Sequence, residues 1–248
     1  MTGADTTLLL IVVTGAFFVK AITGMGGPIL AIPLLAPALG FEEAVIAVSF
    51  ANIMSNLLLV WGNRASARAT LPILRRLVPA GVVGAVAGSL ILVSVDDRWL
   101  SAGLAVVVFS YIGLTVWKGA ISLPARVRLK AAVPIGAAGG IVHGATGNSG
   151  AVLATYLHSL DLPRSEFVFA ATVPFMLLST VQISTLTLMG RVHEPVLTPA
   201  LMAMIPVILI TPLGTRVGRG LNEHTFSIMV LVLLGIAGLR LVGSVFDM

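Results

Sequence analysis

Residues 20–28 read Lys-Ala-Ile-Thr-Gly-Met-Gly-Gly-Pro and interrupt an apolar run that extends over about 8–39. Glycine in a helix interior costs roughly 1 kcal/mol relative to alanine. Proline removes a backbone donor and best suits the first turn of a new helix. The stretch therefore predicts a half-helix over about 9–22, an unwound turn over 23–27, and a second half-helix over about 28–39.

A second copy of this break lies in the other half of the chain, where residues 143–150 read His-Gly-Ala-Thr-Gly-Asn-Ser-Gly within the apolar run 131–160. An offset of 123 residues relates four pairs of positions: Lys20 and His143, Thr23 and Thr146, Gly24 and Gly147, Gly27 and Gly150. The pattern predicts one integral membrane unit with an N-terminal repeat (1–120), a basic linker (121–130) and a C-terminal repeat (131–248).

Composition places the chain among membrane proteins. Of its 248 residues 57% are apolar and only 10% are charged, against about 25% charged in globular proteins, and the mean hydropathy is +1.05. The sequence predicts an all-α polytopic membrane protein embedded in a lipid bilayer. The net charge of +5 comes mostly from arginines in short loops, which indicates membrane orientation and not nucleic-acid binding. With no cysteine, disulfides and thiolate metal sites are excluded, and no cofactor is expected.

Two topologies fit the broken segments. One straight helix over the first run would be roughly 46 Å long, against a hydrocarbon core of about 30 Å. If both segments are hairpins, the halves are inverted, and eleven Lys and Arg residues fall on one side against three. If both are full spans, the split is ten to four. Charge does not separate the two topologies, but inverted repeats with broken helices are a common transporter plan, which favours hairpins.

Helix contacts can be predicted from the run at 77–95, which follows a predicted basic loop at 62–76. Gly81, Gly84 and Gly88 have a spacing that lets two helices approach closely in lipid. We interpret Gly84 and Gly88 as packing residues.

The predicted membrane interior contains bases and no acids. All ten Asp and Glu residues lie in tails or predicted loops, which argues against a cation pathway. Lys20 and His143 lie inside apolar runs, one turn from the breaks. A lysine within the membrane costs about 2.5–3.5 kcal/mol, which indicates a function. Unwound backbone and the N-termini of the following half-helices add N–H donors and a positive dipole, and the combination predicts an anion site.

Further polar side chains in the next spans are expected to line the same cavity. Asn52 and Asn56 are four residues apart on one face of the run 44–61, and Ser179 lies in the matching region of the second half, beside Thr180 and Gln182. The predicted substrate-binding residues are Lys20, Thr23, Gly24, Gly26, Gly27, Asn52, Asn56, His143, Thr146, Gly147, Asn148, Ser149, Gly150 and Ser179.

Each of these residues has a structural alternative. Lys20 can extend to the membrane surface if its hairpin is shallow. His143 can be a packed, neutral histidine, and the asparagines can hydrogen-bond between helices. The glycines at the first break can serve close packing alone.

The motifs resemble those of the sulfite exporter TauE/SafE family, also called TSUP transporters. The resemblance rests on the Thr-Gly-x-Gly-Gly break, the weaker copy His-Gly-x-Thr-Gly-x-Ser-Gly and the two similar halves, and it covers almost the whole chain. It implies transport of sulfite, sulfonates or related sulfur-containing anions across the inner membrane. The roles of Lys20 and His143 as ligands come from the residues and not from the resemblance.

The sequence therefore predicts a secondary transporter of a small sulfur-containing anion (sulfite, a sulfonate or a sulfocarboxylate) in the inner membrane, working by alternating access. The proton gradient or the membrane potential would drive it, and His143 is the candidate for proton coupling because histidine titrates near physiological pH. An anion channel and a transporter of a non-sulfur anion remain alternative functions. A homodimer is a possible assembly. An enzyme is not expected, because Ser149 and His143 have no buried carboxylate to orient the histidine.

Overall fold

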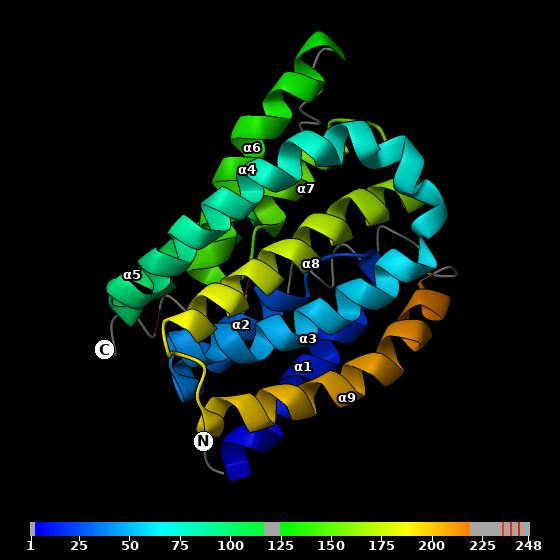
Figure 1. The fold of residues 1–248 in the computed structure, drawn as a ribbon. Helices are drawn as coiled ribbons and strands as arrows, with labels where there is room; N and C mark the ends of the chain where they lie inside the picture. Colours follow the sequence, from blue (N-terminus) through cyan, green and yellow to red (C-terminus); the bar gives the residue numbers. More distant parts are fainter. Residues whose placement is uncertain (1–2, 117–124, 219–234, 236–238, 240–242, 244–248) are drawn as a thin grey trace.

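The computed structural model describes residues 3–116 and 125–218 and the single positions 235, 239 and 243. Over these residues the chain is helical and contains no strand (Figure 1). The elements are α1 (Gly3–Thr23), α2 (Gly27–Leu39), α3 (Phe41–Gly62), η1 (Arg64–Ser66), α4 (Ala67–Ser94), α5 (Asp97–Val116), α6 (Ala125–Thr146), α7 (Gly150–His158), α8 (Arg164–Leu188) and α9 (Glu194–Val217). Residues 121–124 of the predicted linker lie outside the described residues, and 125–130 belong to α6. The last predicted span, over about 225–242, also lies outside them apart from positions 235 and 239.

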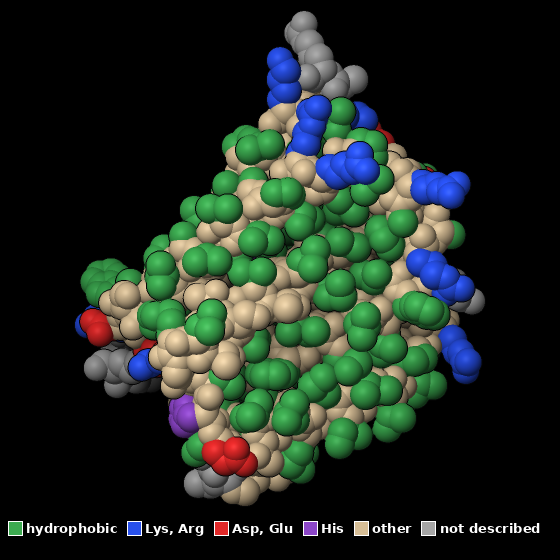
Figure 2. Space-filling view, in the orientation of Figure 1, with side chains coloured by type: hydrophobic (Ala, Val, Ile, Leu, Met, Phe, Trp, Pro, Cys, Tyr) green, Lys and Arg blue, Asp and Glu red, His purple; other side chains and the backbone are tan. Residues whose placement is uncertain are grey.

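Five of the described helices, α1, α3, α4 with η1, α8 and α9, are long and apolar enough to cross a membrane. Figure 2 shows a broad apolar surface across the middle of the molecule, with Lys and Arg side chains along its upper and right edges and acids at the lower left. A band of this kind between charged edges is what a lipid-embedded helical protein needs. The prediction of an all-α, multi-pass membrane protein is therefore confirmed.

The predicted basic loop at 62–76 is wrong in its extent, because α4 already begins at Ala67. The first turns of α4 are amphipathic: one stripe is buried and the arginines point outward. The buried stripe comprises Thr70, Leu74, Leu77 and Gly81, and the exposed arginines are Arg68, Arg75 and Arg76. The helix thus extends beyond its apolar run.

Both broken segments fold back on themselves. The Tyr156 hydroxyl, near the end of α7, donates to the backbone carbonyl of Arg128, near the start of α6 (2.8 Å), so α7 returns along α6. Helices α1 and α2 likewise pack on each other. The arrangement is that of hairpins, with one difference from the prediction: the first arm, α1, has 21 residues and, at 1.5 Å per residue, a length of about 31 Å. It is therefore not a half-helix.

Helix boundaries and helix contacts follow the offset of 123 residues. Three boundary pairs are separated by this number: the ends of α1 and α6 (Thr23, Thr146), the starts of α2 and α7 (Gly27, Gly150), and the starts of α3 and α8 (Phe41, Arg164). If α1, α3 and α4 correspond to α6, α8 and α9, the packing of α1 on α9 is the counterpart of α6 on α4, and that of α3 on α9 the counterpart of α8 on α4. Two homologous halves would produce this pattern, and their homology remains a prediction.

Glycines hold α4 against α6. A Cβ atom placed on Gly84 or Gly88 would lie 2.3 or 2.1 Å from a backbone carbonyl oxygen of α6. One placed on Gly140 or Gly144 would lie 2.0 or 2.2 Å from a carbonyl oxygen of α4. Since no side chain fits these gaps, the backbones of the two helices are in direct contact, as the glycine spacing predicts.

Candidate functional site

The two Thr-Gly turns have the same local construction. The Thr23 hydroxyl lies within hydrogen-bond distance of the carbonyls of Val19 (3.0 Å) and Met25 (2.6 Å). The Thr146 hydroxyl lies 2.7 Å and 3.1 Å from the carbonyls at the equivalent positions, four residues earlier and two residues later. In this structure both threonine hydroxyls therefore close their own turns, and substrate binding by them remains a prediction.

The glycines of these turns lie at separate places in the fold. Gly24 (φ +84°) and Gly147 (φ +70°) adopt the left-handed conformation that glycine accepts without strain. Gly24 packs against Val168 near the start of α8, and Gly147 packs against Val45 near the start of α3. Val45 and Val168 are themselves 123 residues apart, so each turn contacts the same part of the opposite half. The residues that the fold joins by hydrogen bonds are the two bases that precede these turns.

Five predicted site residues form one continuous chain of hydrogen bonds. Lys20 in α1 donates to the side-chain oxygen of Asn52 in α3, whose amide nitrogen donates to the Ser179 hydroxyl in α8 (2.9 Å). That hydroxyl lies 2.9 Å from Nε2 of His143 in α6, and His143 Nδ1 lies 3.2 Å from the Ser149 hydroxyl. All five residues are at most 2% exposed. The chain thus joins both bases across the two halves.

The direction of the first two hydrogen bonds is fixed by their donors. Because Lys20 and the amide nitrogen of Asn52 only donate, the Ser179 oxygen accepts from Asn52. The Ser179 hydroxyl can then donate to Nε2 of a neutral His143, or accept a second hydrogen bond from Nε2 of a protonated one, and the Ser149 hydroxyl has the same choice at Nδ1. The two hydroxyls can therefore serve both protonation states of the histidine.

No carboxylate balances Lys20 within the described part of the chain. The two ion pairs found there are Arg128–Asp161 and Arg191–Glu42, and the Lys20 ammonium instead lies 5.2 Å from the centre of the Phe17 ring. A buried charge without a partner is unfavourable. The described residues accept from only one of its three N–H donors, so the site has capacity for an anion.

Several buried polar atoms have no partner among the described residues. They are the Ser55 hydroxyl, both amide atoms of Asn56, the side-chain nitrogen of Asn148 and the Thr211 hydroxyl. Leaving such a group unsatisfied costs about 1–3 kcal/mol. Buried polar groups in native proteins nearly always have a partner, so these atoms point to a ligand or ordered water at their positions.

The remaining predicted glycines shape the starts of α2 and α7. The aliphatic stem of Lys20 lies against Gly27, where a Cβ atom would approach its Cδ to 3.0 Å, and Gly26 forms the turn before it (φ +100°). The Gly150 N–H donates to the side-chain oxygen of Asn148 (2.9 Å). The amide at the start of α7 is thus already used, whereas Gly27 makes room for Lys20.

Gln182 and Ser49 are residues that the predicted set lacks. The Gln182 amide nitrogen donates to the carbonyls of His143 (3.0 Å) and Gly144 (2.8 Å), and its oxygen accepts from Ser49 (2.9 Å). Gln182 thus fixes the last turn of α6, which carries the histidine. The sequence placed Gln182 in the region expected to line the cavity, three residues after Ser179 in an apolar helix, but not among the predicted binding residues. The same expectation for Thr180 is wrong, because its side chain is exposed.

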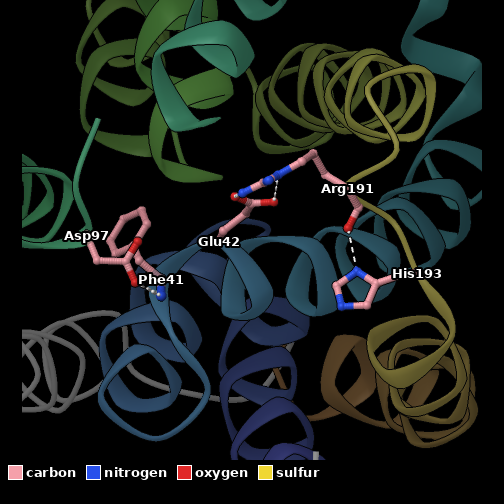
Figure 3. Close-up of polar contacts among 5 residues, drawn as sticks. All are labelled: Phe41, Glu42, Asp97, Arg191 and His193. Carbon is pink, nitrogen blue, oxygen red and sulfur yellow. Dashed lines mark hydrogen bonds and ion pairs between the residues drawn. The ribbon is translucent and has the colours of Figure 1, made fainter. Parts of the chain in front are cut away.

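A second polar cluster lies at one end of the molecule (Figure 3). Arg191, between α8 and α9, makes two hydrogen bonds to Glu42 at the start of α3 (2.8 and 2.6 Å), and these bonds raise the pKa of Arg191. Asp97 accepts from the Phe41 N–H (2.9 Å), and His193 donates to the Arg191 carbonyl (2.9 Å). Around them lies a cavity of about 460 Å³. The ion pair between Arg191 and Glu42 connects the two halves.

Replacing Arg191 with Gln is expected to have a small effect on stability. The arginine side chain is 48% exposed, and exposed ion pairs contribute about 0.2–1 kcal/mol. For a protein of this size we expect the melting temperature to fall by about 4 °C or less, and the difference to shrink at high salt. Thermal unfolding in detergent, with Arg75→Gln as an exposed control, measures it. A much larger fall would mean that the pair carries the contact between the halves.

Comparison with known proteins gives one match. A family model described as sulfite exporter TauE/SafE matches residues 8–241, a range that includes all the site residues above. Neither the curated proteins nor the solved structures contain a significant match.

Proposed function

The chain belongs to the sulfite exporter TauE/SafE family, a family of membrane transporters for sulfite and related anions, and from this premise we propose that it is a secondary transporter. Its substrate is a small sulfur-containing anion (sulfite, a sulfonate or a sulfocarboxylate), and it moves this anion across the inner membrane by alternating access. The observation that supports the proposal best is the buried Lys20, which is joined to His143 and has no carboxylate partner among the described residues.

Electrostatics supports an anionic substrate. An isolated positive charge in the membrane interior is costly, and an arriving anion would offset that cost while losing its own hydration. The carboxylates found in ion pairs, Glu42 and Asp161, lie at helix ends and pair with arginines there. They therefore do not compete with a substrate for Lys20.

Burial supports alternating access over a permanent pore. The residues of the hydrogen-bonded chain are at most 2% exposed, so in this state the site is closed to water. Both halves contribute to it, and a relative movement of the halves would expose it to one side at a time.

Flux into liposomes tests the proposal. Purified protein should take up sulfite with saturable kinetics, and a panel of sulfonates, sulfate and carboxylates should compete according to their affinity. Single-channel currents in a planar bilayer would instead identify an anion channel. Saturable uptake of carboxylates with no competition by sulfite would identify a transporter of a non-sulfur anion.

His143 is expected to give transport part of its pH dependence. In His143→Gln the amide can still hydrogen-bond to Ser179 and Ser149, but it does not gain a proton on acidification. If His143 couples protons to transport, the ratio of variant to wild-type sulfite uptake should change with pH. Taking the ratio cancels the titration of sulfite itself. A ratio that stays constant across the pH range would remove His143 from proton coupling.

A further inference from the structure

Asn56 is a buried residue whose hydrogen-bonding capacity the protein does not use. Its side chain is fully buried in α3, and neither the amide nitrogen nor the amide oxygen has a partner. It lies one helical turn from Asn52, which accepts a hydrogen bond from Lys20. An unpaired buried amide one turn from the residue that accepts from a buried ammonium group points to a ligand at this position.

The equivalent position in the other half shows which way Asn56 faces. Asn56 and Ser179 are 123 residues apart, as are Lys20 and His143, and Ser179 contacts His143 at 2.9 Å. The same offset relates the contact of Gly24 with Val168 to that of Gly147 with Val45. If the two halves correspond, this offset predicts that the Asn56 amide faces the Lys20 ammonium. Ser179 contacts His143 directly, whereas the amide atoms of Asn56 have no hydrogen-bond partner among the described residues.

On the basis of the proposed transport function, we infer that the substrate anion binds between Lys20 and Asn56, and that Asn56 selects its protonated, singly charged form. The ammonium supplies one positive charge, which one negative charge balances. The Asn56 nitrogen donates a hydrogen bond to an anion oxygen, and the Asn56 oxygen accepts a hydrogen bond from the O–H group of the anion. Hydrogen sulfite has both features, whereas the sulfite dianion has no proton and carries a second, unbalanced charge.

The neighbouring titratable groups leave this charge balance intact. Within the buried hydrogen-bonded chain the two ionisable side chains are Lys20 and His143, and a neutral His143, which its two hydroxyl partners accommodate, leaves Lys20 as the one positive charge. The acids of the packed helices α3 and α8, Glu42, Glu43 and Glu166, and the described base of α9, Arg216, lie in the first or last turn of their helices.

Sulfite uptake at several pH values on either side of neutrality tests the inference. Because the second ionisation of sulfurous acid falls in this region, the KM for total sulfite should rise with pH in proportion to the loss of hydrogen sulfite. The same rise should appear in His143→Gln, which separates substrate titration from histidine titration. A KM for total sulfite that does not change with pH in His143→Gln would overturn the selection of the protonated form.

The substitution Asn56→Leu tests the residue itself. Leucine fills the space but makes no hydrogen bonds, so the KM for sulfite should rise about ten- to a hundredfold, while the melting temperature should stay equal or rise. Asn63→Ala, at the end of the same helix, should keep the wild-type KM. A wild-type KM in Asn56→Leu, with or without a lower melting temperature, would overturn the inference. Wild-type protein that does not transport sulfite would instead contradict the proposed function from which the inference starts.

Discussion

Replacing Lys20 with methionine is expected to abolish sulfite transport while leaving the protein folded. Methionine keeps the unbranched stem that packs against Gly27 but removes the charge. Truncating one partner of a buried charge pair costs about 2–5 kcal/mol, which corresponds to roughly a 30- to 5,000-fold loss of affinity. Removing a buried charge that has no protein counter-charge should leave the melting temperature unchanged or raise it.

Uptake into liposomes and the shift of melting temperature on adding sulfite measure the two effects separately. Lys130→Met, at the exposed start of α6, is the matched control and should keep wild-type uptake. If Lys20→Met retains wild-type affinity, Lys20 is not part of the site. If both variants lose uptake equally, the effect is one of net charge and not of the buried site.

Local sequence was sufficient to predict the two turns, because their chemistry is carried by neighbouring residues. A threonine followed by glycine closes the turn with its own hydroxyl, and the glycine takes a positive φ. The offset alone showed that Lys20 and His143 occupy equivalent positions, each three residues before a Thr-Gly turn. Their connection through Asn52 and Ser179 could not, because it depends on how α3 packs against α8.

The errors in the predicted fold have a common cause. Apolar runs mark the part of a helix that lies in lipid, but helices continue as long as one face is buried. Arg68, Arg75 and Arg76 made the first turns of α4 look like a loop, although Thr70 and Leu74 are buried there. Likewise α1 begins at Gly3 and not near residue 9, because its polar first turn is still helical.

The sequence placed Gln182 in the region expected to line the cavity but did not predict its role, for a related reason. Its role is to donate to the backbone carbonyls of His143 and Gly144, and backbone partners leave no mark in the sequence. The unpaired Asn56 shows the opposite case. Its position was predicted from spacing to Asn52, but only the structure shows that its amide has no partner among the described residues, and our proposal that it binds the substrate rests on this.

Replacing Gly140 with alanine is expected to be the most damaging single change to the fold. The new Cβ atom would lie 2.0 Å from the carbonyl oxygen of Gly81 and 2.9 Å from the Ala85 nitrogen, so α4 and α6 would have to separate. Overpacking of this kind costs roughly 3 kcal/mol, which for this chain length corresponds to a fall in melting temperature on the order of 10 °C. His143 lies one turn further along α6, so sulfite uptake should fall as well.

The same substitution at Gly103 provides the control. Gly103 lies in α5 with no atom within 4 Å of the new Cβ position, and alanine favours a helix over glycine by about 1 kcal/mol, so Gly103→Ala should keep or raise the melting temperature. Thermal unfolding of both variants in detergent, together with their elution as single species, measures the difference. If Gly140→Ala unfolds at the wild-type temperature, the two helices are not held in backbone contact. The close approach of α4 to α6, which positions the last turn of α6 and its histidine, would then lose its support.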